Sequence, residues 1–163
     1  MTLEKKIAEK PEGFVTKIEK TVYKMVILPS LLAIARKYAE IGDIRWIGYV
    51  ELIEEDAKKY GINISAKVSK IKEIGYKKTV LSELRLARKY AKLGDVLEME
   101  ISIERAQEYA KKCGIDISDQ IGEIRKVGYR RAIQKYAEKC GIDISNLMEE
   151  IKKICRKREV QKN

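Results

Sequence analysis

The chain has 163 residues, of which 45% are apolar and 37% are charged. This length and apolar content suffice for one folded domain with a buried core, and they exclude a chain that is disordered throughout. Lysine and arginine (35) outnumber aspartate and glutamate (25), so the net charge is +10 at pH 7. Such a balance favours anionic partners, nucleic acid or an acidic protein surface, although it also serves solubility alone.

The residues that most enzymes rely on are missing or badly spaced. The chain has no histidine, and its three cysteines lack Cys-x-x-Cys spacing. Zinc sites and histidine-based catalysis therefore lose their usual side chains, and we interpret the cysteines as reduced packing residues. The glycines do not form a phosphate-binding loop, and the acidic run at residues 54–56 would spread around a helix. We predict that the protein is not an enzyme and has no cofactor and no metal site.

Nothing in the sequence indicates a membrane segment. No apolar run approaches the roughly 20 residues that cross a bilayer, and the N-terminal residues lack the apolar centre of a signal peptide. We therefore expect a cytoplasmic protein without a membrane partner.

In chain order, residues 11–42 are predicted to form N-terminal capping helices. Pro11 to Gly13 can open a helix that runs to about Leu28, because proline suits the first helical turn. Pro29 is expected to end that helix, and Ser30 to restart a second one that reaches Gly42.

Two units follow, at residues 43–93 and 95–140, and a C-terminal capping helix is predicted over residues 145–158. Each unit begins with an aspartate, Asp43 or Asp95, that can cap a helix. Each then continues into a long segment, residues 65–93 or 118–140. The sequence leaves open whether these segments are continuous helices.

Three segments share the pattern Ala-x-x-x-Gly-Ile, which is typical of a Schellman helix end. They are Ala57–Ile62, Ala110–Ile115 and Ala137–Ile142. The glycine would adopt the left-handed conformation, and the isoleucine would pack on the alanine. Each segment continues into Ile-Asn/Asp-Ile-Ser, and we predict that the serines, Ser65, Ser118 and Ser145, cap the next helix.

The chain also matches itself with a period of about 53 residues. Residues 57–78 match residues 110–131 without a gap, whereas residues 35–39 match residues 87–91 one position out of step. Self-similarity in helical hairpins predicts a stacked array in which each unit buries its apolar stripe on its neighbours. We therefore predict a single all-α domain, residues 1–163, built as an array of antiparallel helical hairpins with six to eight helices.

The segment from Tyr90 to Ala110 resembles the tetratricopeptide repeat. The aromatic, Leu-Gly, apolar and alanine positions of that family are matched by Tyr90, Leu93, Gly94, Leu97 and Ala106. The first copy keeps Tyr38, Ile41 and Gly42 but has Arg45 at the apolar position, and the family's period is shorter. The resemblance covers about a third of the chain. It implies paired helices and a partner-docking role, and it implies no particular ligand residues.

One repeated element offers candidate contacts with nucleic acid or an acidic partner. It reads Gly-Tyr-Lys-Lys in the first copy and Gly-Tyr-Arg-Arg in the second, and the candidates are Tyr76, Lys77, Lys78, Tyr129, Arg130 and Arg131. Aromatic and arginine planes can stack on bases while lysines meet phosphates. Alternatively, the tyrosines pack between units and the basic side chains are solvated.

A second candidate surface is particular to the first unit. Trp46, Tyr49 and Leu52 lie beside the main apolar stripe of their helix, and direct alignment places Trp46 opposite Glu98 in the second unit. We predict that Trp46 is buried under the helix from Glu12 to Leu28, whose apolar side carries Val15, Ile18, Val22 and Val26. If that helix does not cover them, the three residues become candidate apolar contacts with a partner.

These observations favour a non-catalytic scaffold that docks a protein or peptide. The alternative is a helical-repeat protein that binds nucleic acid, RNA rather than DNA, through a basic face interleaved with tyrosine. The sequence leaves the oligomeric state open.

Overall fold

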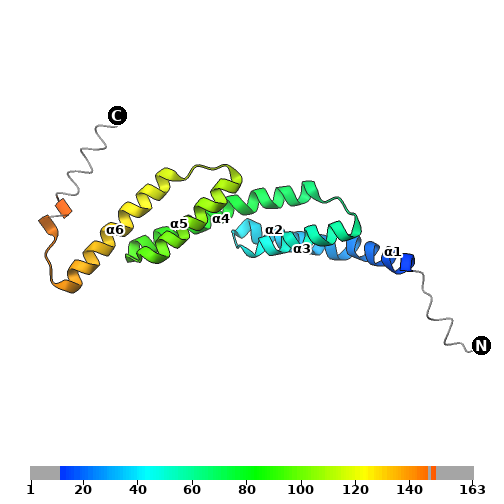
Figure 1. The fold of residues 1–163 in the computed structure, drawn as a ribbon, viewed down its shortest axis with the longest axis horizontal. Helices are drawn as coiled ribbons and strands as arrows, with labels where there is room; N and C mark the ends of the chain where they lie inside the picture. Colours follow the sequence, from blue (N-terminus) through cyan, green and yellow to red (C-terminus); the bar gives the residue numbers. More distant parts are fainter. Residues whose placement is uncertain (1–11, 147, 150–163) are drawn as a thin grey trace, which may run out of the picture. The chain divides into compact units, whose positions relative to one another are not determined.

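The computed structural model describes residues 12–146, 148 and 149, and this part of the chain is helical without any strand. The helices α1 (Glu12–Val22), η2 (Tyr23–Ile27) and α2 (Leu28–Ile41) run into one another, and α3 (Arg45–Tyr60), α4 (Ser65–Leu93), α5 (Val96–Cys113) and α6 (Ser118–Cys140) follow (Figure 1). The all-α prediction is confirmed. The described residues form five continuous helical segments, fewer than the six to eight helices predicted, and most of the predicted helix at 145–158 lies outside them.

Pro29 does not end the N-terminal helix, so that prediction is wrong. It lies in the first turn of α2, directly after the π-helical η2, in which the Leu28 N–H bonds to the carbonyl of Tyr23 five residues earlier. Ser30 does not restart a helix, because it lies inside α2, where its hydroxyl donates to the Val26 carbonyl at 3.0 Å. Proline removes one helical hydrogen bond and crowds the carbonyl four residues before it, and the wider π turn keeps the chain helical there.

The glycine helix ends are confirmed. Gly61, Gly114 and Gly141 all have positive φ angles, between 61° and 67°. The N–H of each following isoleucine donates to the carbonyl of the alanine five residues earlier, at 2.8, 3.0 and 2.9 Å in chain order. This is the long hydrogen bond of the Schellman end, and the chain forms it where a left-handed residue closes the helix.

The helix starts differ from the prediction that serine is the cap. The Oδ1 atom of Asn63 accepts hydrogen bonds from both the N–H (3.1 Å) and the hydroxyl (2.8 Å) of Ser65. The same arrangement joins Asp116 to Ser118. The Asn or Asp side chain therefore opens the helix through an Asx turn, and the serine donates to it. These hydrogen bonds from Ser118, its N–H first, lower the pKa of the Asp116 carboxyl.

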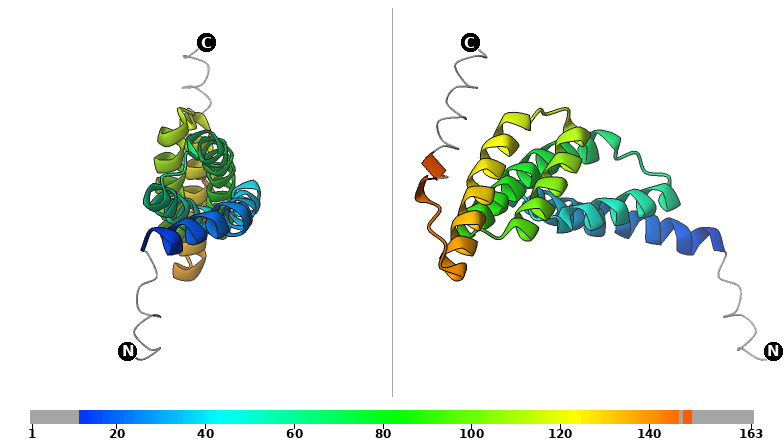
Figure 2. Two further views of the ribbon diagram at one scale, coloured as in Figure 1. Left: turned by 90° about the vertical axis from the view of Figure 1, so that its right-hand side faces the viewer. Right: turned by 60° about the vertical axis from the view of Figure 1, so that its left-hand side comes forward.

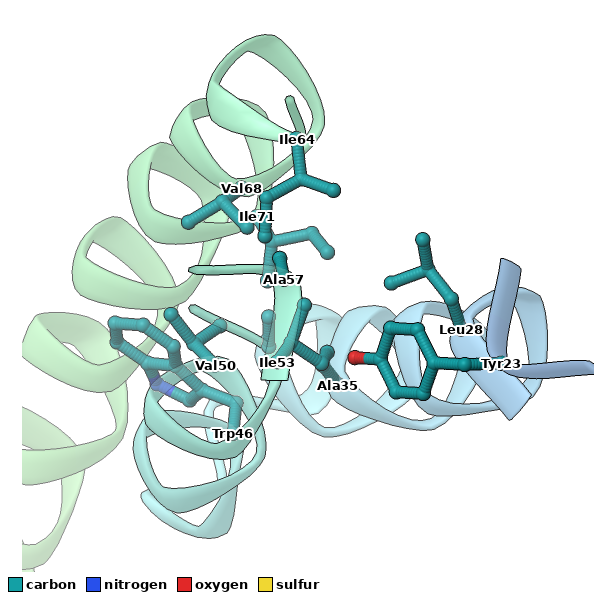
Figure 3. Packing of buried hydrophobic residues seen from close by; sticks show 11 residues of the cluster. Tyr23, Leu28, Ala35, Trp46, Val50, Ile53, Ala57, Ile64, Val68 and Ile71 are labelled. Atoms are coloured by element: carbon teal, nitrogen blue, oxygen red, sulfur yellow. The ribbon is translucent and has the colours of Figure 1, made fainter. Parts of the chain in front are cut away.

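The chain divides into two compact units. Unit 1 contains the described residues up to Ser82 together with Glu108–Ile115, and unit 2 contains Glu83–Gln107 and the described residues from Asp116 on. In unit 1, α2 and α3 lie side by side (Figures 1 and 2). The core of unit 1 extends from Tyr23 through α2 and α3 to Ile71 of α4 (Figure 3).

The same interhelical contact occurs once in each unit. In unit 1 the fully buried ring of Trp46 lies on Gly75, where an added Cβ would come within 2.5 Å of the indole Cε2. In unit 2 the fully buried Met99 lies on Gly128 in the same way. The structural counterpart of Trp46 is therefore Met99, and its predicted alignment with the exposed Glu98 is wrong.

The turn before each helix explains this shift of one residue. The chain is one residue shorter between Gly42 and Trp46 than between Gly94 and Met99. The Trp46 N–H reaches the carbonyl of Asp43, three residues back, whereas the Met99 N–H reaches that of Asp95, four residues back. The tighter first turn in unit 1 compensates for the missing residue and brings both side chains onto a glycine.

Candidate functional site

Tyr76, the first candidate for base stacking, is a packing residue of unit 1. Its ring meets the Trp46 ring edge-on, with centroids 4.9 Å apart, and stacks on the Tyr109 ring at 6.2 Å. The Lys112 ammonium lies 5.8 Å from its centroid. Aromatic pairs at these distances stabilise a fold by about 0.5–1.5 kcal/mol beyond their buried area. With these neighbours in place, Tyr76 matches the packing alternative better than the stacking one.

Tyr129, the corresponding residue of unit 2, has different surroundings. It is 45% exposed, and its hydroxyl donates to Oε1 of Glu100 at 2.9 Å. Arg125 donates to the other oxygen of the same carboxylate at 2.6 Å. The hydrogen bond from Arg125 lowers the pKa of Glu100, and the bond to Glu100 raises the pKa of Tyr129. The two tyrosines thus share a sequence position but not an environment.

The four basic candidates also differ from one another. Lys77 is held by Glu73 at 2.8 Å, and this hydrogen bond raises the pKa of Lys77. The side chain of Lys78 is exposed, and its backbone packs closely on Gly42, where an added Cβ would lie 2.7 Å from the Lys78 carbonyl oxygen. Arg130 and Arg131 form no ion pair within the described residues. Unit 1 therefore contributes one paired and one solvated cation, and unit 2 contributes two cations without a carboxylate partner.

Trp46 is buried, as predicted, but the covering element is α4 and not the N-terminal helix. Its indole N–H donates to Oγ1 of Thr79 at 3.2 Å. Figure 3 shows Trp46 at the opposite end of the labelled cluster from Tyr23 and Leu28. The side chains predicted to cover it are solvent-exposed: Ile18 by 50%, Val22 by 45% and Val26 by 61%, while Val15 lies outside the described side chains.

The neighbours of Trp46 in the sequence do not form one apolar surface with it. Tyr49 stacks on Tyr38 with ring centroids 5.5 Å apart, whereas Leu52 is 45% exposed. The guanidinium of Arg45 lies 4.3 Å from the Tyr38 ring centroid. Of the three candidate apolar contacts, Leu52 alone keeps a largely free side chain.

A ligand-sized groove lies between α2 and α4 of unit 1. It is lined by Leu32, Ala33 and Arg36 of α2 and by Lys67, Lys70, Ile71 and Ile74 of α4, and its volume is about 490 Å³. Ile71 is buried, Leu32 and Ile74 are half-buried, and the three cationic residues are exposed. This α2–α4 groove therefore combines an aliphatic floor with a cationic rim.

The charge of the rim is not balanced within the groove. None of its lining residues is acidic. Arg36 pairs with Glu40 one turn further along α2, at 2.8 Å on the exposed surface, and Lys67 and Lys70 have no ion pair in the described part of the chain. An exposed pair four residues apart on a helix contributes only about 0.3–0.5 kcal/mol, so Arg36 can exchange Glu40 for a ligand carboxylate at little cost.

Unit 2 has a smaller groove in the equivalent place. It is lined by Arg88, Ala91, Lys92, Glu123, Ile124 and Val127, with a volume of about 200 Å³. The lysines of unit 1 are replaced by Gln120 and Glu123. Arg88 donates to Oε1 of Gln120 at 3.3 Å, which joins the two walls. This α4–α6 groove is therefore smaller than the α2–α4 groove, and its lining carries both positive and negative charge.

The residues of the α2–α4 groove are not among the site residues predicted from the sequence. The spacing of Lys67, Lys70 and Ile74 places them along one side of a helix, and this is the signal that was available. This spacing points to a groove only once it is known that α2 packs beside the same side of α4, and a local sequence pattern does not reveal that packing.

No protein-family model, curated protein or solved structure matches this chain. Within the described residues, no cluster of three or more histidine, cysteine or acidic side chains is placed to hold a metal ion. None of the described helices is long and apolar enough to span a bilayer.

Proposed function

We propose that the protein is a non-catalytic helical-repeat scaffold that docks a segment of a partner protein. Its units would be tetratricopeptide-like helical hairpins with a period of about 53 residues. The repeated Gly-Ile helix ends and the paired contacts of Trp46 with Gly75 and of Met99 with Gly128 support this arrangement. Free thiols at Cys113 and Cys140 suit a reducing, cytoplasmic setting, which is part of the proposal.

The observation that carries the docking role is the α2–α4 groove. Apolar side chains of a ligand would cover Leu32 and Ile74 and gain about 25 cal/mol for each Å² of apolar surface removed from water. Grooves between paired helices receive peptides as amphipathic helices, whose apolar face enters the groove. The candidate catalytic groups of a hydrolase, a nucleophile beside a base, do not occur among the lining residues.

Selection from a displayed library of helical peptides tests the proposal. Ala33 is an exposed residue that lines the groove, and Ala33→Trp places a bulky ring there. We expect the selected peptides to bind this variant at least about tenfold more weakly than the unmodified protein. Leu97→Trp, at an exposed position of α5 in unit 2, is the matched control and should bind normally. Peptides that bind both variants equally well would contradict docking in this groove.

Nucleic-acid binding remains the alternative function, RNA before DNA. The half-exposed Tyr129 next to Arg130 and Arg131, which lack carboxylate partners in the described residues, favours it. It predicts that single-stranded RNA binds with a strong salt dependence, and that reversing Lys77, Lys78, Arg130 and Arg131 to glutamate abolishes binding. RNA binding that this variant retains would remove these residues from the alternative.

A further inference from the structure

We infer that the occupant of the α2–α4 groove is an acidic amphipathic helix of a partner protein. This inference rests on the proposed docking function and adds the charge and conformation of the ligand. Three properties of the groove carry it: an aliphatic floor, a cationic rim without a carboxylate, and walls that are both helices.

The floor selects aliphatic side chains. Leu32, Ile71 and Ile74 offer branched apolar surface, and no aromatic ring lines the groove. Sequence-tolerant binding of single-stranded nucleic acid depends on rings that stack on bases. The guanidinium of Arg36, the one planar group, is turned toward Glu40 at 2.8 Å. The groove therefore suits leucine-like side chains better than nucleobases.

The rim selects negative charge. Arg36 on one wall and Lys67 and Lys70 on the other border the aliphatic floor. Lysines three residues apart on a helix are neighbours on its surface, about 5–6 Å apart at their Cβ atoms. A ligand helix with glutamates one turn apart can reach both ammonium groups while its apolar face stays in the groove. Carboxylates are the matching groups, since a basic or neutral ligand would leave these cations without compensation.

The walls favour a helical ligand over an extended one. An extended peptide gains affinity by pairing its backbone with a free sheet edge, and the described residues contain no strand. Ile71 and Ile74 repeat at the spacing of a helical turn, so apolar side chains three and four residues apart on a ligand helix can alternate with them.

The α4–α6 groove provides an internal comparison. The positions of Lys67 and Lys70 are occupied by Gln120 and Glu123 in unit 2, where Glu123 lines the groove and Gln120 accepts a hydrogen bond from Arg88. The helix ends and the glycine contacts are kept in both units, so this difference in charge is not required by packing. We therefore assign the acidic helix to unit 1 alone.

Fluorescence anisotropy with three labelled peptides tests the inference. The peptides share one leucine-rich face and a helix-favouring backbone, and their polar face carries glutamate, glutamine or lysine. We expect the glutamate peptide to bind the full-length protein at least about tenfold more tightly than the glutamine peptide and to weaken with added salt. Ala33→Trp should weaken the binding of both.

Two double variants locate the charge effect. Lys67→Glu with Lys70→Glu should weaken the glutamate peptide by about tenfold or more, because attraction becomes repulsion at the groove. The control, Lys24→Glu with Lys89→Glu, changes the net charge equally at exposed positions outside the groove and should stay within about threefold. Circular dichroism verifies that each variant is folded.

The outcomes separate this inference from the docking function itself. Equal binding of the glutamate and glutamine peptides, blocked by Ala33→Trp, would overturn the acidic ligand and leave docking intact. Equal weakening by the two double variants would show that overall charge is responsible, and the inference would fall. Failure of all three peptides, while library-selected peptides still bind in the groove, would also overturn it. Displacement of the glutamate peptide by single-stranded RNA at the groove would replace it with the nucleic-acid alternative.

Discussion

Units 1 and 2 use the same helix-on-helix contact with side chains of different stiffness. Trp46 fills the space over Gly75 with a rigid ring that is also held by Tyr76 and Thr79. Met99 fills the space over Gly128 with an unbranched chain whose rotatable bonds let it adapt. The close approach of two helices therefore requires the glycine, while the side chain that covers it can change as long as it is apolar and buried.

In the grooves of the two units, the apolar packing residues are alike and the charged residues differ. Ile71 and Ile74 in unit 1 become Ile124 and Val127 in unit 2, whereas the two lysines become glutamine and glutamate. Since the aliphatic floor serves both units, the open cationic rim is a property of unit 1 that the fold does not demand. The predictions that follow change one unit at a time and compare it with the other.

The largest difference is expected between Gly75→Ala and Gly128→Ala. A Cβ at Gly75 would lie 2.5–2.8 Å from three atoms of the Trp46 ring, which has no room to move, so we expect a loss of about 2–4 kcal/mol. At Gly128 the same atom meets the end of Met99, which can rotate away. There the higher helix propensity of alanine, about 0.5–1 kcal/mol, should offset much of the strain. Urea denaturation measures both.

Gly122→Ala is the matched control for this pair. It lies inside α6, and an added Cβ would meet nothing within 4 Å, so propensity alone should stabilise the protein by about 0.5–1 kcal/mol. Similar losses at Gly75 and Gly128 would show that Met99 is as immobile as Trp46 and would remove the contrast between the units.

The next largest effect concerns the glycine helix ends, which both units share. Gly61 and Gly114 of unit 1 and Gly141 of unit 2 have φ angles between 61° and 67°, and an added Cβ would meet no atom closer than 3.9 Å. Valine resists the left-handed conformation, so its substitution at each glycine should cost at least about 1 kcal/mol, by nearly equal amounts. Thermal unfolding measures the loss. An unchanged melting temperature in any of the three variants would contradict the Schellman assignment at that helix end.

These helix ends could be predicted from the sequence because the signal is local and complete. Within six residues, the alanine provides the carbonyl acceptor, the glycine adopts the left-handed conformation, and the isoleucine makes the apolar contact. The helix starts were predicted at the correct serines, although Asn63 and Asp116 accept the hydrogen bonds there. At these helix starts the same short segment allowed either the serine or the Asn/Asp two residues before it to accept the hydrogen bonds.

The contacts between helices could not be predicted in the same way. The alignment of Trp46 depended on one residue that is missing from the turn before it. The structure compensates at the start of α3, where the Trp46 N–H donates to a carbonyl three residues back and not four. The continuity through Pro29 depended on a π turn, which has no clear sequence signature. The α2–α4 groove depended on which face of α4 meets α2, and packing between segments far apart in the chain decides that.

A smaller, pH-dependent effect is expected at Glu83 of unit 2. Its side chain is buried, and its Oε2 atom has no hydrogen-bond partner within the described residues. Burial raises the pKa of this carboxyl, and the nearby Arg105 lowers it by less. A raised folded pKa favours the protonated form, so its contribution to stability is present at acid pH and is lost as the pH rises through that folded pKa.

Glu83→Gln should therefore raise the free energy of unfolding at pH 7 by about 1 kcal/mol, and the gain should vanish near pH 4. Denaturation at a series of pH values measures it. Glu104→Gln, at an exposed position of α5, serves as the control and should show little gain. If Glu83→Gln instead makes the protein less stable at pH 7, the attraction to Arg105 outweighs the burial of the charge.

The smallest effect should come from the ion pairs that join neighbouring helices in each unit. Glu100 and Arg125 of unit 2 are 2.6 Å apart, and Glu100 also accepts the Tyr129 hydroxyl. Lys72 and Glu54 of unit 1 are 2.7 Å apart, with the carboxylate more exposed than that of Glu100. Glu100→Gln should cost about 0.5–1 kcal/mol at pH 7, and Glu54→Gln should cost less, because exposed single pairs are weak.

The pH dependence of the Glu100 pair should distinguish it from Glu83. The hydrogen bond from Arg125 lowers the folded pKa of Glu100, so its contribution is present above the unfolded pKa and is lost as the pH falls through the folded one. Denaturation across pH should therefore show that Glu100→Gln is less stable than the unmodified protein at pH 7 and that this difference shrinks in acid. Glu83→Gln should also lose its difference in acid, but at pH 7 it should be the more stable protein. A Glu54→Gln variant that loses more than Glu100→Gln would show that exposure does not rank these pairs.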